Sequence, residues 1–450
     1  MKKITESDLR RIERTDRFGL TRRTFTRGAL SAALAAPLLA NPAFVNRLKA
    51  KDFSGKKLKV MINQPHAGSI EPLAAGFAEL TGAEVEGVPV PYDQLRAQAI
   101  LDVVSGTNEF DVFEYFYVDV EAMVEDGVIA DVTDRIEAER DVIDPDDFLG
   151  SLYDTYTLVD GRRYGLPYDG DTHVLFYNAE ILDRNGQTPP KTWDDYTAVT
   201  RAVTEAEKSD GIYGAVMMCQ QVPIIICSTY ANRLGGFGGD FVDGDGRPTL
   251  NTEAAFEAAQ AMVDAAPYAT PTPLETGFGN AIPLFLGGQA GMIEFWTDMG
   301  TWAEDPEQSK IVGKWGVLPM PVGGSNTVHR PAMNAGFGFA VSTGAKDPDM
   351  AWEFIKMASS KEFHKQVLTN NKTGVDPTRK SAMEAYKAFA PKQGEVVEQA
   401  ILDAYPWPRT PKSPELMQAL TDELGLMLAG SKNAKDAMND AQTAWEKILG

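Results

Sequence analysis

The order of strand-like and helix-like segments early in the chain limits most strongly which fold it can adopt. The segments 56–64 (KKLKVMINQ), 83–90 (AEVEGVPV) and 110–118 (FDVFEYFYV) are apolar and rich in β-branched or aromatic residues, which is typical of strands. Between them, residues 70–82 and 93–106 place apolar side chains at helical spacing. This alternation predicts an open α/β sheet whose ligand-binding groups lie at the carboxyl ends of the strands.

The first 50 residues are predicted to be an export signal and leader. Arg22 and Arg23 precede the uncharged run 28–39, which is shorter than the about 20 residues that a membrane-spanning helix needs. Basic residues, a short apolar run and then small residues are the layout of a signal peptide, and paired arginines are typical of the twin-arginine type. A frayed amphipathic leader is the alternative. We expect cleavage between residues 36 and 51, a mature protein in the periplasm and no stable membrane insertion.

The charge of the chain excludes several classes of partner. It contains 43 Lys and Arg against 64 Asp and Glu, a net charge of −21, and the leader is basic, so the acidic excess lies beyond it. An acidic surface repels nucleic acid phosphates and anionic lipid headgroups, so we expect neither as a partner. A small neutral solute suits such a protein better, and we expect the protein to act as a monomer.

The two cysteines and the DGDG motif are residue types that bind metals or form redox pairs in other proteins, but their spacing here predicts structural roles. Cys219 and Cys227 lie eight residues apart among Val and Ile, which is neither a metal-ligand spacing nor a CxxC pair. Two buried thiols are favoured, with a disulfide as the alternative. The DGDG motif at 243–246 lacks the later ligands of an EF-hand loop, so it predicts a hairpin turn. No metal or cofactor is expected.

Length and turn signals together predict two lobes joined by crossing segments. About 400 residues follow the leader, more than one hydrophobic core usually serves. The turn-rich stretches Tyr164–Asp171 and Gly324–Phe339 are flanked by strand-like runs. If the chain crosses between lobes at both, each lobe is discontinuous and a hinge separates them. The predicted boundaries are 51–168 plus 334–376 for the N-terminal lobe and 169–333 plus 377–450 for the C-terminal lobe.

Seven motifs then carry a resemblance to a known family. In order along the chain they are LPYDGDTHVLFYNAEIL, PPKTWDDYTAVTRAV, GGFGGDFVDGDGRPTLNTEAA, GGQAGMIEFWTDMGTW, GVLPMPVGG, AGFGFAVSTGAKDPDMAWEFIKMASS and AMNDAQTAWEKILG. In the second motif, Thr192 is suited to cap a helix. Together they resemble the extracellular solute-binding proteins of carbohydrate ABC importers, the broad family that includes maltose-binding protein. The resemblance covers nearly all of residues 56–450.

This resemblance implies a fold and a function. It implies two α/β lobes that close on a sugar or polyol and present it to a membrane permease of an ABC transporter. The cleft aromatics of this chain are mainly Tyr, unlike the pattern of maltose-binding protein, so a monosaccharide, disaccharide or polyol is expected rather than an extended maltooligosaccharide. Closure is predicted about the crossings near Asp169 and Asn334.

A sugar site needs planar polar groups for its hydroxyls and aromatic rings for its apolar face. We expect such residues at strand ends and crossings. The resemblance implies an acidic hydrogen-bonding group at Asp171 and a stacking aromatic at Trp296, and Glu114 accompanies the Tyr candidates. The full set of predicted ligand-binding residues is Gln64, His66, Tyr115, Tyr117, Asp171, His173, Tyr230, Asn232, Trp296, Asp298, Asn334, Trp407 and Arg409.

Three alternatives remain open. Carboxylates and aromatics in a cleft also serve a secreted glycoside hydrolase, but the sequence contains no G-x-S-x-G elbow, H-E-x-x-H helix or phosphate-binding glycine loop. No catalytic residues are therefore assigned. The second alternative is the same fold with another solute: a polyamine, a phosphate ester or a metal chelate. The acidic balance favours a cationic ligand, although the cleft candidates are mixed rather than uniformly acidic, and the sequence offers no Arg/Lys cluster for a phosphate ester. The third is that individual candidates are ordinary turn, capping or core residues.

Overall fold

The structure is a computed structural model that describes residue 46 and residues 51–450. Contacts divide the chain into the units Met1–Leu38 and Leu39–Gly450, and all described residues lie in the second unit. Apart from residue 46, the predicted export signal lies outside the described residues.

The first sheet contains the strands predicted from the beginning of the chain. Its order is β2-β1-β3-β11-β6, with β1 parallel to β2 and β3 and with β11 antiparallel to β3 and β6. All five residues of β3 are buried, as expected for a strand covered on both faces. The strand bounds are β1 (Lys57–Asn63), β2 (Glu84–Val90), β3 (Val112–Phe116), β6 (Leu166–Asp169) and β11 (Phe337–Val341).

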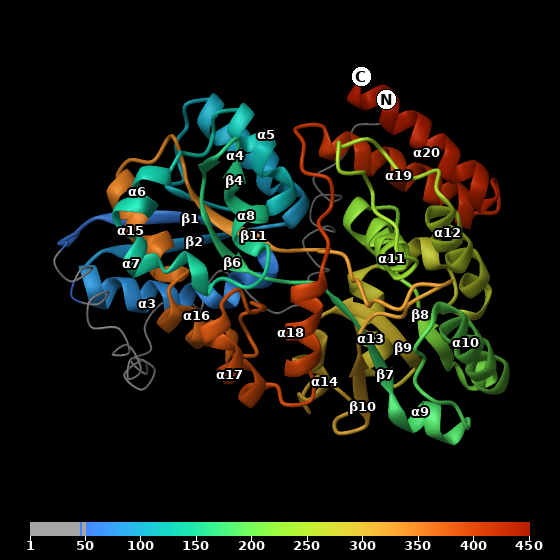
Figure 1. The fold of residues 1–450 in the computed structure, drawn as a ribbon. Coiled ribbons are helices and arrows are strands. Elements are labelled where there is room, and N and C mark those ends of the chain that lie inside the picture. Colours follow the sequence, from blue (N-terminus) through green and yellow to red (C-terminus); the bar gives the residue numbers. More distant parts are fainter. Residues whose placement is uncertain (1–45, 47–50) are drawn as a thin grey trace, which may run out of the picture. The chain divides into compact units, whose positions relative to one another are not determined.

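Helices cover both faces of this sheet, with α3 and α16 on one side and α4 and α5 on the other (Figure 1). The predicted apolar residues Leu73, Phe77 and Leu80 are buried on α3, which ends at Gly82 with a φ of 77°. The helices are α3 (Ile70–Thr81), α4 (Leu95–Val104), α5 (Val120–Glu125), α6 (Thr133–Ala138), α7 (Arg140–Ile143), α8 (Leu152–Thr157), α15 (Pro348–Ala358), α16 (Lys361–Leu368) and α17 (Lys380–Phe389), with a small hairpin of β4 (Leu158–Val159) and β5 (Arg162–Arg163).

The second sheet has the order β10-β7-β9-β8. Strand β9 is antiparallel to β7 and parallel to β8, and every residue of β9 is buried. The strand bounds are β7 (His173–Asn178), β8 (Tyr213–Val216), β9 (Ala290–Trp296) and β10 (Trp315–Leu318).

The second group of helices surrounds this sheet. Helix α10 begins with the expected cap, in which the Asp195 backbone N–H donates to Thr192 Oγ1 at 3.0 Å and the Asp195 carboxylate accepts from the Thr192 backbone. The helices are α9 (Ala179–Arg184), α10 (Trp193–Glu207), α11 (Pro223–Gly236), α12 (Glu253–Ala265), α13 (Phe278–Leu286), α14 (Met299–Ala303), α18 (Gly394–Asp403), α19 (Ser413–Leu428) and α20 (Ala434–Leu449).

Short 3₁₀ turns link these elements. They are η1 (Gln64–Ser69), η2 (Tyr92–Gln94), η3 (Tyr117–Asp119), η4 (Pro145–Asp147), η5 (Lys208–Asp210), η6 (Ala266–Tyr268) and η7 (Pro273–Glu275). Among the described residues, no helix combines the length and apolarity that a membrane crossing requires.

The chain passes between the two sheets at the predicted crossings. It leaves the first sheet after Asp169 and enters the second at His173, and it returns between β10 and β11. Just before β11, Gly336 has a φ of 129°, and a Cβ there would lie 1.9 Å from the Tyr156 hydroxyl, so this position requires glycine. The chain therefore has the two α/β lobes and crossing segments that the sequence predicts.

The two short motifs have the structural roles that the sequence favours. Cys219 and Cys227 are free thiols and both are buried. Cys227 Sγ lies 3.3 Å from Thr421 Oγ1. At the DGDG motif, the Gly246 N–H donates to the Asp243 carbonyl at 2.9 Å, which forms the predicted turn. Within residues 51–450, no group of three or more His, Cys, Asp or Glu side chains is arranged to hold a metal ion.

Candidate functional site

Five carboxyl groups gather beside the crossing between the sheets. They come from the first sheet, the crossing itself, the end of β9 and the segment after α16, and only the fold brings them together. We call these residues the acidic cluster: Glu114, Asp169, Asp171, Asp298 and Asp376.

His66 on η1 is the basic side chain of this cluster. Its Nδ1 lies 2.5 Å from Glu114 Oε1, and its Nε2 lies 3.8 Å from Asp169 Oδ2. Burial lowers the pKa of His66, but the charges of Glu114 and Asp169 outweigh burial and raise it to about 9. The imidazole is therefore positively charged at neutral pH.

Asp169 and Asp376 are joined through the backbone. The Asp376 N–H donates to Asp169 Oδ1 at 2.7 Å, and the Tyr386 hydroxyl donates to Asp376 Oδ1 at 3.4 Å. Asp169 is fully buried, and its Oδ2 accepts no hydrogen bond. Burial raises the pKa of Asp169 to about 8, although the nearby His66 charge opposes this shift.

Asp171 and Asp298 complete the cluster from the side of the second sheet. Asp171 Oδ1 accepts from the Thr297 N–H at 3.4 Å and from Thr297 Oγ1 at 3.3 Å. Burial, followed by the neighbouring carboxyl groups, raises the pKa of both aspartates well above the ordinary value. Asp298 Oδ1 is buried without a hydrogen-bond partner. Asp298, Asp376 and Tyr386 line a hollow of about 20 Å³.

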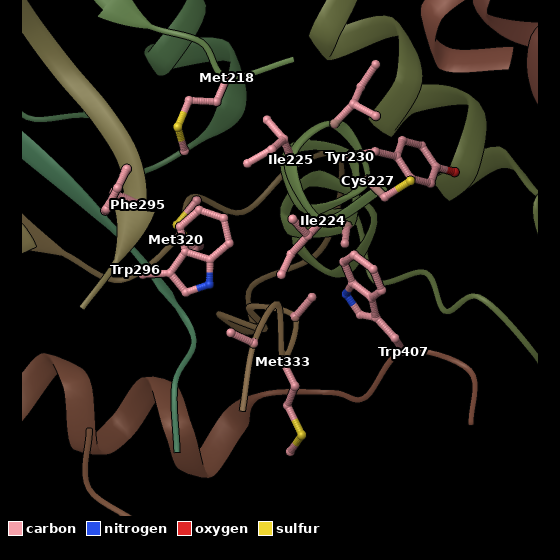
Figure 2. Close-up of a cluster of buried hydrophobic side chains, with 14 of the residues drawn as sticks. Met218, Ile224, Ile225, Cys227, Tyr230, Phe295, Trp296, Met320, Met333 and Trp407 are labelled. Atoms are coloured by element: carbon pink, nitrogen blue, oxygen red, sulfur yellow. The ribbon is translucent and has the colours of Figure 1, made fainter. Parts of the chain in front are cut away.

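An aromatic pair lies directly next to these carboxyl groups. His173 on β7 is paired in register with Trp296 on β9, and their ring centroids lie 4.1 Å apart at an angle of 83°. Both residues are buried, and neither His173 Nε2 nor Trp296 Nε1 has a hydrogen-bond partner. Figure 2 shows Trp296 beside Met320, on the opposite side of Ile224 and Met333 from Trp407.

A chain of neutral hydrogen bonds runs from this pair toward the segment between β10 and β11, which we call the return crossing. We call it the amide chain: Asn232 Nδ2 donates to His173 Nδ1 at 2.8 Å, Asn334 Nδ2 donates to Asn232 Oδ1 at 2.8 Å, and Trp407 Nε1 donates to Asn334 Oδ1 at 3.1 Å. Burial lowers the pKa of His173 to about 3, so its ring is neutral. Because Nδ1 accepts, the proton is on Nε2, which has no acceptor.

Three predicted tyrosines bond to the backbone. The Tyr115 hydroxyl donates to the Tyr156 carbonyl at 2.9 Å, and the Tyr230 hydroxyl donates to the Ala255 carbonyl at 3.4 Å inside the packing of α11 on α12. The Tyr117 hydroxyl donates to the Met333 carbonyl at 2.9 Å and accepts from the Trp407 N–H at 2.9 Å. Of these three side chains, only Tyr117, through its bond to Met333, joins the first sheet to the return crossing.

Gln64, Trp407 and Arg409 lie apart from the acidic cluster. Gln64 is exposed on η1. Trp407 and Arg409 line a separate hollow of about 470 Å³, which no residue of the acidic cluster lines. Arg409 forms an ion pair with Glu121 at 3.1 Å. The structure thus brings together His66, Asp171, His173, Asn232, Trp296, Asp298 and Asn334, and places the other candidates elsewhere.

Sequence reasoning missed two members of the cluster. Asp169 ends the Pro-containing strand β6 and was identified only as a hinge position. Asp376 lies in KTGVDPT, more than 200 residues away, where a glycine turn precedes it. The turn was the only local signal for Asp376, because its partners come from distant segments.

Comparison with known proteins shows which family the chain matches. The family model described as bacterial extracellular solute-binding protein matches residues 63–365. The chain is 25% identical over 443 residues to a probable amino-acid ABC transporter periplasmic-binding protein of Sinorhizobium fredii, covering 96% of this chain and 98% of the relative.

Solved structures show the same fold. An ABC transporter solute-binding protein from Agrobacterium radiobacter K84, in complex with ribitol, has a TM-score of 0.78 and 25% identity, and the match covers 88% of this chain and 100% of that one. A maltose-bound protein of T. maritima also has a TM-score of 0.78, at 22% identity, with the same coverage. The two-lobed fold expected from the sequence is thereby confirmed.

Proposed function

We propose that this chain, which belongs to the family of bacterial extracellular solute-binding proteins, captures a sugar or polyol for an ABC importer. The family consists of binding proteins, so the chain is assigned binding rather than catalysis. The Agrobacterium protein of the same fold is bound to ribitol, and several relatives carry names of ABC transporter components. A permease that accepts the captured solute is the partner that this role requires.

The observation that carries the proposal is the position of Asp171 beside the His173–Trp296 pair. A polyol offers hydroxyl donors on one side and C–H groups on the other. Carboxylates accept hydroxyl protons, and ring faces cover C–H groups. The His173 Nε2–H and the Trp296 Nε1–H have no partner in the structure, so each can donate to a ligand oxygen. Acceptors, donors and ring faces for one polyhydroxylated molecule therefore lie side by side.

Besides Glu114, Asp169 and Asp376, the ligand-binding residues that we propose are His66, Asp171, His173, Asn232, Trp296 and Asp298. Tyr117, Asn334 and Trp407 act at the return crossing, where their hydrogen bonds link the two sheets. We assign them to positioning the lobes.

The lobe boundaries near Asp169 and Asn334 are also part of the proposal. Support comes from sheet membership, because β1, β2, β3, β6 and β11 form one sheet, and all strands between residues 173 and 318 form the other. Closure about these crossings buries the carboxyl groups and rings, and a ligand that contacts both lobes stabilises the closed state. A permease can distinguish this state from the open one.

We place the protein in the periplasm after twin-arginine export. The support is the leader sequence with Arg22 and Arg23, together with the extracellular character of the family.

The proposal is tested by titrating the full chain with ribitol, D-mannitol and maltose in a calorimeter. We expect saturable 1:1 binding of at least one of them. Asp171→Asn should weaken that binding about tenfold or more, because it replaces a carboxyl oxygen that accepts hydrogen bonds with an amide N–H₂ that donates them. The matched control is Asp183→Asn, which makes the same change at an exposed position of α9. The proposal is contradicted if no neutral sugar or polyol binds, or if the protein turns one over.

A further inference from the structure

The acidic cluster contains more carboxyl groups than its surroundings could balance if all of them were ionised. Within residues 51–450, His66 is the one basic side chain that comes within 4.0 Å of any of its carboxylates. It contacts Glu114 and Asp169. Asp171, Asp298 and Asp376 form no ion pair with a Lys or Arg among the described residues. A neutral polyol adds hydroxyl donors but no positive charge, so it leaves this imbalance unchanged.

Other buried carboxylates among the described residues have either a cation or backbone donors. Glu294 lies 2.9 Å from an Arg233 nitrogen, and Glu353 lies 2.7 Å from a lysine Nζ. Asp102 and Asp111 are buried without a cation from the described part of the chain, and each accepts from two backbone N–H groups instead. The fold thus supplies a cation or backbone N–H donors where a buried carboxylate serves the structure. The acidic cluster departs from this pattern where the candidate ligand-binding groups meet.

Unused acceptors show where a positive donor fits. Asp169 is fully buried, and its Oδ2 accepts no hydrogen bond and has only the His66 ring at 3.8 Å as a charged neighbour within 4.0 Å among the described residues. Asp298 Oδ1 is buried beside the 20 Å³ hollow and has no hydrogen-bond partner. Burial of an unpaired carboxylate is costly. An ammonium group has three donors and one positive charge, and it can satisfy several converging carboxylate oxygens at once.

We propose that the site prefers a polyhydroxylated ligand that carries a protonated amine, such as an amino sugar or an amino alditol. This inference rests on the proposed function, since it names the ligand class of the same site. The amine lies among Asp169, Asp298 and Asp376, and the hydroxyl-bearing carbons lie against Trp296 and His173. The acidic excess of the cluster is the basis of the selectivity.

The test compares matched ligands on the full chain by calorimetry at pH 7. Ribitol is compared with its aminodeoxy analogue, in which an amino group replaces one terminal hydroxyl, and with the N-acetyl form of that analogue, which has no charge. We expect the amine to bind at least about tenfold more tightly than ribitol, as a charge-assisted contact allows. The N-acetyl form should lose this gain. D-Mannitol and its aminodeoxy analogue provide a second pair.

Proton release gives an independent measurement. The aminated ligand should expel protons that the crowded carboxyl groups hold, so its binding heat should differ between buffers of different ionisation enthalpy. Ribitol should show little difference. Asp298→Asn and Asp376→Asn should each reduce the preference for the amine, whereas Asp183→Asn should leave it unchanged.

The outcomes separate the two proposals. Equal or tighter binding of the neutral ligand overturns the amine preference and leaves the proposed function standing. Failure of every neutral and aminated polyol to bind overturns both. If putrescine, which has amines but no hydroxyls, binds as tightly as the aminated polyol, the proposal of a polyhydroxylated ligand is wrong and the site is a polyamine site.

Discussion

Two buried charged regions of this chain differ in how their charges are balanced. In the second lobe, Arg233 Nη1 donates to Glu294 Oε2 at 3.0 Å, and Arg233 Nη2 forms an ion pair with Glu294 Oε1 at 2.9 Å. The guanidinium lies 4.2 Å from the Trp193 ring centroid. The acidic cluster has five carboxyl groups around His66. The first region is a closed set of one cation and one anion, and the second is open to a further cation or to several hydroxyl donors.

This difference in charge balance distinguishes charged groups that stabilise the fold from charged groups that bind a ligand. A buried ion pair costs desolvation energy that its own attraction offsets, so it remains buried in every state of the protein. The acidic cluster lacks that internal balance, and its carboxyl groups hold protons instead, as the raised pKa of Asp169 shows. A ligand that enters the cluster replaces those protons or donates to the same oxygens.

The largest effect is expected from breaking the balanced pair. Arg233→Met leaves Glu294 buried and without its cation, which should lower the free energy of unfolding by about 3–5 kcal/mol. Urea unfolding followed by tryptophan fluorescence measures this loss. Arg233 also contacts the Trp193 ring, so part of the loss comes from packing.

The double variant Arg233→Met, Glu294→Met is the control for charge. It removes both partners and should recover most of the lost stability. A loss below about 1 kcal/mol in the single variant contradicts the view that this pair is a structural unit.

The next effect concerns pH. In the folded protein the pKa of Asp169 is raised to about 8 and that of His66 to about 9, so both groups bind protons more tightly than in the unfolded chain. Their contribution to stability is complete below the unfolded pKa and is lost as pH rises through 8 and 9. The free energy of unfolding of the ligand-free protein should fall on the order of 2 kcal/mol between pH 7 and pH 10.

The control for this prediction is a variant in which these two groups cannot titrate. Asp169→Asn together with His66→Asn should reduce the decline, and what remains comes from the other cluster aspartates and from repulsion of the acidic surface. A decline of equal size in the double variant shows that Asp169 and His66 do not cause it.

The third effect concerns ligand affinity. Trp296→Phe keeps an aromatic ring but removes Nε1–H, which has no partner in the structure. We expect the affinity for ribitol to fall about tenfold, through the smaller ring face and the lost donor. Stability should change less, because the deleted donor made no internal bond. Calorimetry and urea unfolding on the same preparation measure both. An unchanged affinity removes Trp296 from the site.

The sequence predicts the first sheet well because its strands and helices follow local patterns. The run KKLKVMIN becomes β1, and the apolar residues of α3 recur at helical spacing. The capping box at Thr192 is also local, since its two members lie three residues apart. Hydrophobic periodicity and capping residues therefore predict helices and strands whose signals lie within the element itself.

The site is predicted less completely because it depends on distant contacts. Asp171 and Trp296 were recognised at strand ends, and the structure places Asp171 against Thr297, next to Trp296. Asp376 has no periodic or motif signal, and its backbone N–H reaches Asp169 only through tertiary packing. Tyr230 fits an aromatic binding residue by type, yet its hydroxyl bonds to the Ala255 carbonyl within the core. Residue type alone does not distinguish these two environments.

The smallest effect comes from Trp407, which has the same indole donor as Trp296 but in the balanced amide chain. Its Nε1 donates to Asn334 Oδ1 at 3.1 Å, and Asn334 in turn donates to Asn232. Trp407→Phe leaves the buried Asn334 oxygen unpaired, so it should lower the free energy of unfolding by about 1 kcal/mol. Ribitol affinity should stay within about twofold, because the ring lies outside the acidic cluster. Parallel titration and unfolding of Trp407→Phe and Trp296→Phe compare one substitution in two surroundings. A loss of affinity at Trp407 equal to that at Trp296 means that the return crossing contacts the ligand, and the division between balanced framework and open site then fails at this position.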